Sequence, residues 1–171
     1  MLKFLVFVLC ILVTGCFRPD CDVEGAYGEC IVHYVGQDDM INSVDKSLLL
    51  FADNLQTVLN NTDLVSVDTI LVAVCATPEH IKKSLHRLNI IFVPAPFACI
   101  SNGETGFCLG TEWQGEVIIS APDRLSDTAL YHELLHWVDE LCWVDIDYHH
   151  VRDDWWGVPH KLNKILKENG L

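Results

Sequence analysis

The stretch on which the fold depends is Leu130-Tyr131-His132-Glu133-Leu134-Leu135-His136-Trp137, which contains the motif H-E-x-x-H. On a helix, residues i and i+4 share one face, so the imidazoles of His132 and His136 can reach a single Zn²⁺ ion. Glu133 lies beside the first histidine and can act as general base on a zinc-bound water. The spacing therefore predicts a helix over residues 126–142 with two metal ligands and a catalytic glutamate.

A catalytic zinc ion usually has three protein ligands and an open position, so a third ligand must come from outside the motif. A histidine six residues after His136 would extend the motif, but residue 142 is cysteine. Glu140, one turn after His136, would orient a ligand imidazole or be exposed. The best candidates follow the helix in Asp145-Ile146-Asp147-Tyr148-His149-His150, where a chain reversal would return a side chain to the metal.

These residues resemble small zincin-like metalloproteases of bacteria and phages, many of which are lipoproteins. Their pattern is H-E-x-x-H, then G-D-x-D-x-x-H and an aromatic residue. The matching residues here are Asp145, Asp147 and His150, followed by Trp155 and Trp156. Residue 144 is valine where that group usually has glycine. The resemblance covers residues 128–156, and it implies a zinc peptidase with His150 as third ligand; His149 is the neighbouring alternative.

Other polar residues near the motif have less specific roles. Asp145 or Asp147 would orient a ligand imidazole through its free N–H, or would cap a turn. Tyr148, Tyr131 and Arg152 are candidates to stabilise an oxyanion beside the metal, and the spacing selects none of them.

The first residues have the features of a secretory signal. Lys3 precedes an apolar run over residues 4–13, which is shorter than the roughly 20 residues of a membrane-spanning helix. The run ends in Val13-Thr14-Gly15-Cys16, which resembles the lipobox of bacterial lipoproteins. We therefore expect Cys16 to be lipidated and the protein to be exported and held in the bacterial cell envelope. An ordinary signal peptide, with Cys16 unmodified, is the alternative.

Length and charge limit the classes of protein. With 171 residues, 50% of them hydrophobic, the chain has room for one folded domain. A formal net charge of −13 without a cluster of Lys and Arg argues against nucleic-acid binding. The expected divisions are a lipoprotein signal peptide over residues 1–15, a lipidated N-terminus and tether over residues 16–29, and a single zincin-like domain over residues 30–171.

The remaining cysteines favour disulfides in an oxidising compartment, because an even number is left once Cys10 and Cys16 are set aside. They are Cys21, Cys30, Cys75, Cys99, Cys108 and Cys142. Sequence alone does not choose the pairing. The turn-rich residues 101–106 favour the pair Cys99–Cys108, and Cys21–Cys30 is the other pair we expect. No C-x-x-C occurs, which argues against a structural zinc cluster.

Hydrophobic spacing and turn signals predict helices and short strands without a regular βαβ order, and hence an α+β fold. The expected helices cover residues 43–59, with Asn42 or Ser43 as N-cap, 78–88 after the N-cap Thr77, 126–142 and 159–169. The expected strands cover residues 30–35, 67–75, 90–93 and 115–120, with a loop over 94–111. We expect a short mixed sheet packed on helices, including an active-site helix and a C-terminal helix.

The function that these features favour is a zinc-dependent hydrolase, namely a membrane-anchored extracytoplasmic metallopeptidase that acts on a peptide or protein. Strand 115–120 directly precedes the metal helix, so it would align an extended substrate as the edge strand of zincins does; an ordinary core strand is the alternative. The alternative function is a non-catalytic surface lipoprotein with a structural or vestigial metal site. A cell-wall amidase is a third candidate, but the sequence has no cell-wall-binding repeat to support it.

Overall fold

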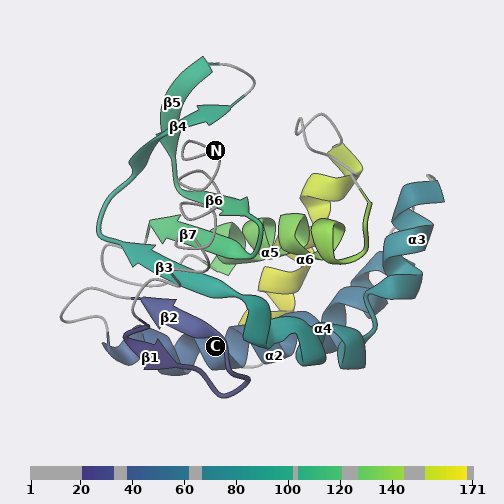
Figure 1. The fold of residues 1–171 in the computed structure, drawn as a ribbon. Helices are drawn as coiled ribbons and strands as arrows, with labels where there is room; N and C mark the ends of the chain where they lie inside the picture. The colour runs from purple at the N-terminus through teal and green to yellow at the C-terminus, as the bar shows by residue number, and fades with distance from the viewer. Residues whose placement is uncertain are drawn as a thin grey trace, which may run out of the picture.

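A computed structural model describes residues 21–32, 38–61, 67–101, 104–120, 127–144 and 153–168. These residues form a mixed α+β fold, as predicted, in which helices pack against a five-stranded sheet and a two-stranded hairpin extends from one end (Figure 1). Among the described residues, no helix is both long and apolar enough to cross a membrane.

The five-stranded sheet has the order β1-β2-β3-β7-β6. These strands are β1 (Val23–Glu24), β2 (Cys30–Val32), β3 (Asn89–Val93), β7 (Glu116–Ser120) and β6 (Gly110–Trp113). The three central strands are parallel, whereas β1 and β6, at the two edges, are antiparallel to their neighbours. The strands β4 (Phe97–Ser101) and β5 (Glu104–Cys108) form the separate antiparallel hairpin between β3 and β6.

The helices connect and cover these strands. They are α2 (Asp38–Asn60), α3 (Val67–Cys75), α4 (Pro78–Ser84), the short 3₁₀ turn η1 (Leu85–Arg87), α5 (Asp127–Leu141) and α6 (Asp153–Glu168). Helices α2, α3 and α4 together make the crossover from β2 to the parallel strand β3. Helix α5 follows β7 and packs against both β6 and β7.

The core lies between the sheet and the helices α2 and α5. Alternation along the strands turns every second side chain inward, and α2 contributes apolar residues at helical spacing. These fully buried side chains include Ile90, Phe92, Val117, Ile119, Leu48, Phe51, Leu55, Leu130 and Leu134. Phe51 stacks on Tyr131 with ring centroids 5.8 Å apart, which joins α2 to α5. Each such side chain contributes about 1.5–3 kcal/mol of hydrophobic stabilisation.

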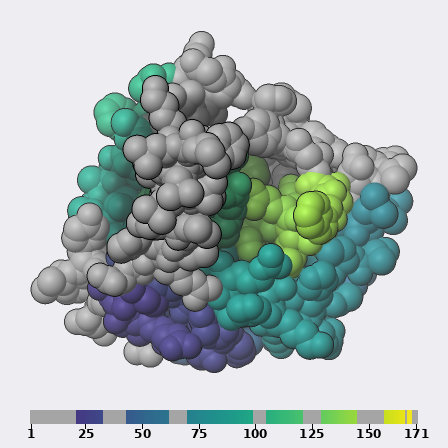
Figure 2. Space-filling view, in the orientation of Figure 1, coloured from purple at the N-terminus to yellow at the C-terminus, as the bar shows by residue number. Residues whose placement is uncertain are grey.

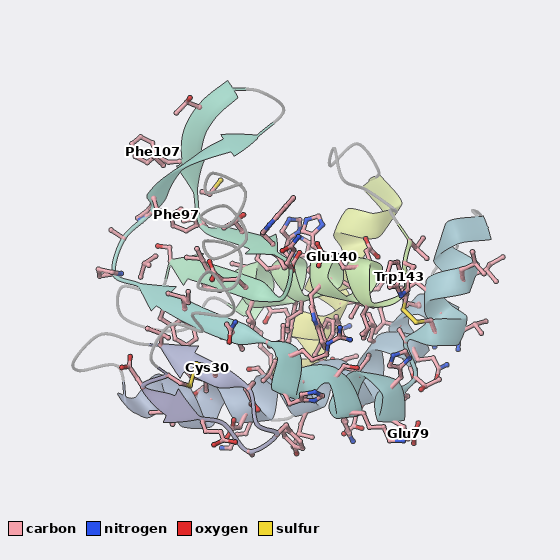
Figure 3. The ribbon with its side chains drawn as sticks, viewed as in Figure 1. Cys30, Glu79, Phe97, Phe107, Glu140 and Trp143 are labelled. Carbon is pink, nitrogen blue, oxygen red and sulfur yellow. A yellow bond between two sulfur atoms is a disulfide. The ribbon has the colours of Figure 1, made fainter. Side chains whose placement is uncertain are left out.

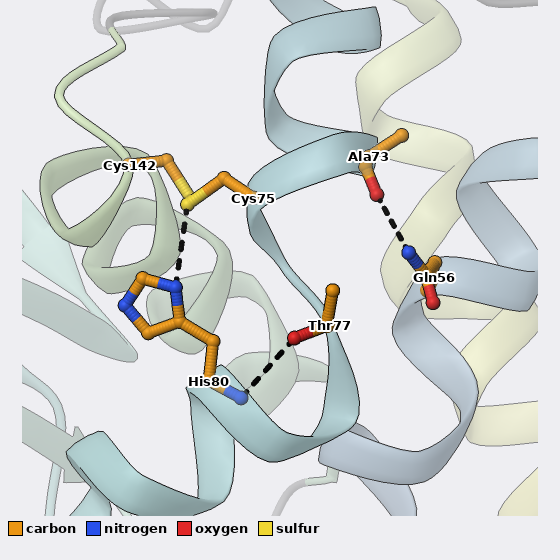
Figure 4. The surroundings of a disulfide bond; sticks show 6 residues. All are labelled: Gln56, Ala73, Cys75, Thr77, His80 and Cys142. Carbon is orange, nitrogen blue, oxygen red and sulfur yellow. Dashed lines mark hydrogen bonds between the residues drawn. A yellow bond between two sulfur atoms is a disulfide. The ribbon is translucent and has the colours of Figure 1, made fainter.

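Residues 67–75 form the helix α3, so the predicted strand is wrong. A short apolar run has no periodicity that separates a buried strand from a helix. Tertiary contacts favour the helix: the Gln56 side chain donates a hydrogen bond to the Ala73 carbonyl (3.0 Å), and Cys75 is disulfide-bonded (Figure 4). The helix is only partly covered, because Ile70, Leu71 and Val74 are more than half exposed.

Three other predicted boundaries are also wrong. Residues 94–111 contain the β4–β5 hairpin and the start of β6 instead of a loop. Helix α2 begins at Asp38, so Asn42 and Ser43 lie inside it and neither is its N-cap. Helix α6 begins at Asp153 and contains Pro159, whereas the sequence predicts Pro159 at its start because proline is favoured in the first turn.

Several local predictions are confirmed. Thr77 caps α4, since its Oγ1 accepts a hydrogen bond from the His80 backbone N–H (3.2 Å), and Pro78 begins that helix. The strands β3 and β7 and the helix α5 lie where the sequence predicts them. Of the strand expected over residues 30–35, residues 30–32 form β2 and the rest lies outside the described residues.

Residues 21–29 belong to the fold, although the sequence predicts a tether over residues 16–29. Their strand β1 pairs with β2, and the expected disulfide Cys21–Cys30 closes the pair. Glu29 is fully buried and accepts a hydrogen bond from the Tyr27 backbone N–H (2.9 Å). Burial raises the pKa of Glu29, and the neighbouring Asp45 raises it further.

A second disulfide, Cys75–Cys142, joins the end of α3 to the residue after α5. The sequence did not predict this pair. His80 lies beside it, with Nδ1 3.9 Å from the Cys75 sulfur (Figure 4). Cys108 is also disulfide-bonded, but its partner lies outside the described side chains, so the pair Cys99–Cys108 stays a prediction.

In Figure 2 the yellow-green end of α5 reaches the surface beside the teal α3–α4 segment.

Candidate metal centre

Helix α5 carries the motif, and its two faces differ in burial. One face is apolar and buried, and its residues are Leu130, Tyr131, Leu134, Leu135, Trp137 and Val138. His132 and His136, one turn apart, are only half-buried. Packing of the apolar face against α2 and the sheet therefore fixes the direction in which the two imidazoles point.

The two imidazoles converge as two ligands of one ion would. The Nε2 atoms of His132 and His136 lie 3.2 Å apart, and the rings meet edge to face with centroids 4.8 Å apart. Two nitrogens bound to a tetrahedral Zn²⁺ at 2.0–2.1 Å are separated by about 3.3 Å. The observed separation thus fits a shared cation.

Glu133 completes the group. One ligand atom from each of His132, Glu133 and His136 lies within 4.8 Å of the others, which is compact enough for one ion. The Glu133 side chain is 6% exposed. Burial raises the pKa of Glu133 to about 8, and the nearby Glu112 carboxylate also raises it. A divalent cation at the histidines would act in the opposite direction and favour the ionised form.

The carboxyl group of Glu133 faces β6. A Cβ placed on Gly110 would lie 2.5 Å from Oε1 of Glu133 and 3.0 Å from its Cδ. Glu112, two residues along the same strand, lies on the same side of β6. Its Oε1 accepts a hydrogen bond from the Gly115 backbone N–H (2.8 Å). Burial raises the pKa of Glu112 to about 7, and Glu140 also raises it.

Gly110 and Glu112 are site residues that the sequence did not predict, because Gly110 falls in the loop expected over residues 94–111 and Glu112 lies between that loop and the strand expected over residues 115–120. A signal was present in the turn between β6 and β7. Gln114 and Gly115 both have positive φ, 53° and 82°, as the two-residue turn of a tight β-hairpin requires. A glycine two residues after Trp113 therefore marks a hairpin with a strand before it.

The edge strand beside the metal helix is β6 and not the predicted strand over residues 115–120. Strand β7 lies between β3 and β6, so it is a core strand, and the prediction that it would be the substrate-aligning edge is wrong. Within the described sheet the edge beside α5 is β6, which pairs with β7 from Gly110↔Ile119 to Trp113↔Glu116. The physical reason is the β6–β7 hairpin, which places one more strand outside β7.

The remaining predicted site residues fall into three groups. Tyr131 is fully buried and stacked on Phe51, and its role as an oxyanion donor stays a prediction. Glu140 is exposed, and its Oε1 accepts a hydrogen bond from the Gln114 backbone N–H (3.4 Å), which links α5 to the β6–β7 turn. The residues Asp145, Asp147, Tyr148, His149, His150 and Arg152 lie outside the described residues, as do the side chains of Trp155 and Trp156 and all of Cys16.

Comparison with known proteins assigns no family to this chain. No protein-family model, no curated protein and no solved structure matches this chain. The interpretation of the site therefore depends on its residues and their geometry.

Proposed function

We propose that this protein is a zinc-dependent hydrolase with a zincin-like fold, and specifically a peptidase. The observation that carries the proposal is the 3.2 Å separation of the His132 and His136 Nε2 atoms, with Glu133 on the same turn of helix. This separation matches two corners of a tetrahedral zinc site. Together with His132 and His136, His150 would hold the ion, with His149 as the alternative to His150, and a position would stay open for solvent or substrate.

The residues of α5 and β6 have complementary tasks in this proposal. Zn²⁺ would act as a Lewis acid, and it would lower the pKa of a bound water toward neutrality. Glu133 takes a proton from the attacking water onto its carboxylate and returns it to the leaving amine. Gly110 leaves room for that carboxylate beside the edge strand, and burial keeps it away from bulk solvent. The position of Glu133 is thus set by both the helix and the strand.

The sheet supports a peptide as substrate. As the resemblance to zincins implies, an edge strand beside the metal helix would align an extended peptide by β-augmentation. Strand β6 is antiparallel to β7, lies at the edge of the described sheet and contacts α5. Among the described residues no strand pairs with the outer edge of β6, so this edge offers backbone donors and acceptors close to Glu133.

The test compares the wild-type protein with Glu133→Gln. We expect the variant to bind one zinc ion per chain, measured by elemental mass spectrometry, and to lose at least about 100-fold in peptide cleavage. Cleavage is followed by mass spectrometry of a mixed peptide library. The control is Glu79→Gln, an exposed glutamate on α4, which should retain both properties. Undiminished turnover by Glu133→Gln, or a zinc-loaded wild type that cleaves no peptide, would contradict the proposal.

We further propose that the protein is an exported lipoprotein with Cys16 as the acylated residue. The Cys21–Cys30 disulfide supports an oxidising compartment. Metabolic labelling with a fatty acid, followed by gel analysis, should mark the wild-type protein and leave Cys16→Ala unlabelled. Equal labelling of both proteins would reject this anchor.

A further inference from the structure

The disulfide Cys75–Cys142 lies near the surface of the protein. Both cysteines are only half-buried. Val74 and Trp143, which follow or precede them directly in the sequence, are 70% and 96% exposed. Figure 3 shows Trp143 beside the sulfur–sulfur bond. A dissolved thiol can therefore approach these sulfur atoms.

The disulfide Cys21–Cys30 is less suited to such an approach. Cys21 is exposed, but Cys30 is only 3% exposed. A thiol that attacked Cys21 would expel Cys30 as a thiolate at a buried position, where an unpaired charge is costly. Attack on Cys30 itself is hindered by its burial. Thiol–disulfide exchange should therefore favour Cys75–Cys142.

His80 provides a proton donor for one of the two sulfur atoms. Its Nδ1 lies 3.9 Å from the Sγ of Cys75 (Figure 4). The His80 backbone N–H donates a hydrogen bond to Thr77 Oγ1, so the start of α4 sets the position of this histidine. A protonated imidazole stabilises a thiolate beside it and makes that sulfur the better leaving group. Cys75 is therefore the sulfur that should leave when a thiol attacks Cys142.

Cys142 directly precedes a strained turn at the end of α5. The Trp143 N–H donates a hydrogen bond to the Glu140 carbonyl (3.1 Å). The Val144 N–H donates one to the Asp139 carbonyl (2.9 Å), which completes a Schellman motif. The residue between these bonds is usually glycine, because its backbone is left-handed, but here it is Trp143 with a φ of 57°. The disulfide thus anchors the chain next to an unfavourable conformation.

This turn connects the two parts of the proposed metal site. Cys142 lies six residues after His136 and eight residues before His150, the predicted third ligand. The disulfide therefore fixes the direction in which the chain leaves the metal helix toward residues 145–152.

We propose that Cys75–Cys142 is a thiol-exchange site that a dithiol reductant opens, and that its opening releases the turn after α5 and weakens metal binding at His132 and His136. The exchange step is independent of the proposed function, whereas its effect on the metal rests on that function.

The exchange transfers two electrons from the reductant to the protein. A thiolate of the reductant attacks Sγ of Cys142, and the sulfur–sulfur bond breaks with its electron pair on Sγ of Cys75, which takes a proton from His80. The proton that the first thiol lost returns to His80 through water. The second thiol of the reductant then attacks the mixed disulfide and releases Cys142 as a thiol, so the reductant becomes a disulfide.

The rate of thiol release tests the exchange site. The full-length protein is incubated with dithiothreitol, and the freed cysteines are labelled with a maleimide and identified by peptide mass spectrometry. We expect Cys75 and Cys142 to be labelled at least about tenfold faster than Cys21 and Cys30.

The variant His80→Ala tests the proton donor. It should slow the labelling of Cys75 and Cys142 at least about threefold. The variant keeps the backbone N–H that Thr77 binds, so the start of α4 is preserved. The matched control is His160→Ala, since His160 is an exposed histidine on α6.

Zinc affinity, measured by competition with a chromophoric chelator, tests the coupling to the metal. Cys75→Ser combined with Cys142→Ser represents the opened disulfide without free thiols that would themselves bind zinc. We expect this protein to bind zinc at least about tenfold more weakly than the wild type, because the site is less preorganised. Cys21→Ser combined with Cys30→Ser is the control and should change the affinity less than about twofold.

Replacement of Trp143 separates the turn from the disulfide. Glycine adopts a φ of 57° without steric cost, so the turn should persist even when the disulfide is open. Adding Trp143→Gly to the Cys75→Ser, Cys142→Ser protein should therefore recover most of the lost zinc affinity. Trp143→Ala in the same background should not, since alanine retains the strain.

The outcomes distinguish this inference from the proposed function. Labelling of Cys75 and Cys142 no faster than that of Cys21 and Cys30, or an unchanged rate in His80→Ala, overturns the exchange site. Unchanged zinc affinity in the Cys75→Ser, Cys142→Ser protein overturns the coupling, as does equal recovery by glycine and alanine.

The labelling experiment uses the native disulfide, so it decides the exchange site even when the wild type binds no zinc, a result that would reject the proposed function and the coupling together. Thermal unfolding verifies that each variant is folded. Should the double serine variant not fold, wild-type protein with its freed thiols alkylated replaces it in the zinc measurement.

Discussion

Gly110 and Glu133 are in contact across the interface between β6 and α5. A Cβ on Gly110 would lie 2.5 Å from Oε1 and 2.8 Å from Cγ of Glu133, closer than side-chain carbons approach such atoms. The absence of a side chain at residue 110 thus lets the edge strand lie against the helix that carries the two histidines. It also holds the Glu133 carboxyl in a buried position that the helix alone would not define.

Gly110→Ala should displace Glu133 and destabilise the protein. We expect a loss of about 1–3 kcal/mol in the free energy of unfolding, because the methyl group overpacks a closed interface. Urea unfolding measures the loss. The control is Gly106→Ala on β5, where an added Cβ meets nothing within 4 Å. The Glu133→Ala background should remove most of the penalty; an equal loss there would show that Glu133 is not the obstacle.

Glu112 should make stability depend on pH. Burial raises its pKa from 4.5 to about 7, so the folded state binds this proton more tightly than the unfolded state does. The contribution of Glu112 to stability is therefore fully present below about pH 4.5 and falls as pH rises to about 7. Glu112→Gln should be more stable than the wild type above pH 7, by on the order of 2 kcal/mol once solvent screening of this partly exposed group is allowed for, and equal to it at low pH.

Urea unfolding over a series of pH values checks this prediction. Glu116→Gln, on the neighbouring strand β7, is the matched control and should follow the wild-type profile more closely. A constant difference between Glu112→Gln and the wild type at all pH values would mean that ionisation of Glu112 is not responsible.

The two assigned disulfides should differ in their contributions to stability. Cys75–Cys142 joins residues 67 apart in sequence, whereas Cys21–Cys30 joins residues 9 apart. The chain-entropy relation gives about 4 kcal/mol for the longer loop and about 2.6 kcal/mol for the shorter one. Paired serine substitutions at each disulfide, compared by urea unfolding, should show this order, and the reverse order would reject the entropic account.

Zinc affinity should depend on both histidines of α5. We expect His132→Ala and His136→Ala each to lower the affinity for Zn²⁺ at least about 100-fold, because each removes one ligand from the site. Competition with a chromophoric chelator measures the affinity. His160→Ala is the control, since His160 is an exposed histidine on α6. Retained affinity in either α5 variant would place the metal elsewhere.

Local sequence determined the parts of this protein that depend on nearby residues. The i, i+4 spacing of His132 and His136 specified one helical face, and Thr77-Pro78 specified the start of α4. Alternation located β3 and β7, and the short separation of Cys21 and Cys30 allowed their disulfide to be anticipated. In each case the residues that determine the feature are close to one another in the sequence.

Tertiary packing decided the rest. Residues 67–75 became a helix because Gln56 and Cys142 meet it from distant parts of the chain. Likewise, β6 became the edge strand, and Gly110 came to face Glu133, only when the hairpin folded back against α5. Periodicity reveals which face of an element is buried, but it carries no information about which other element covers that face.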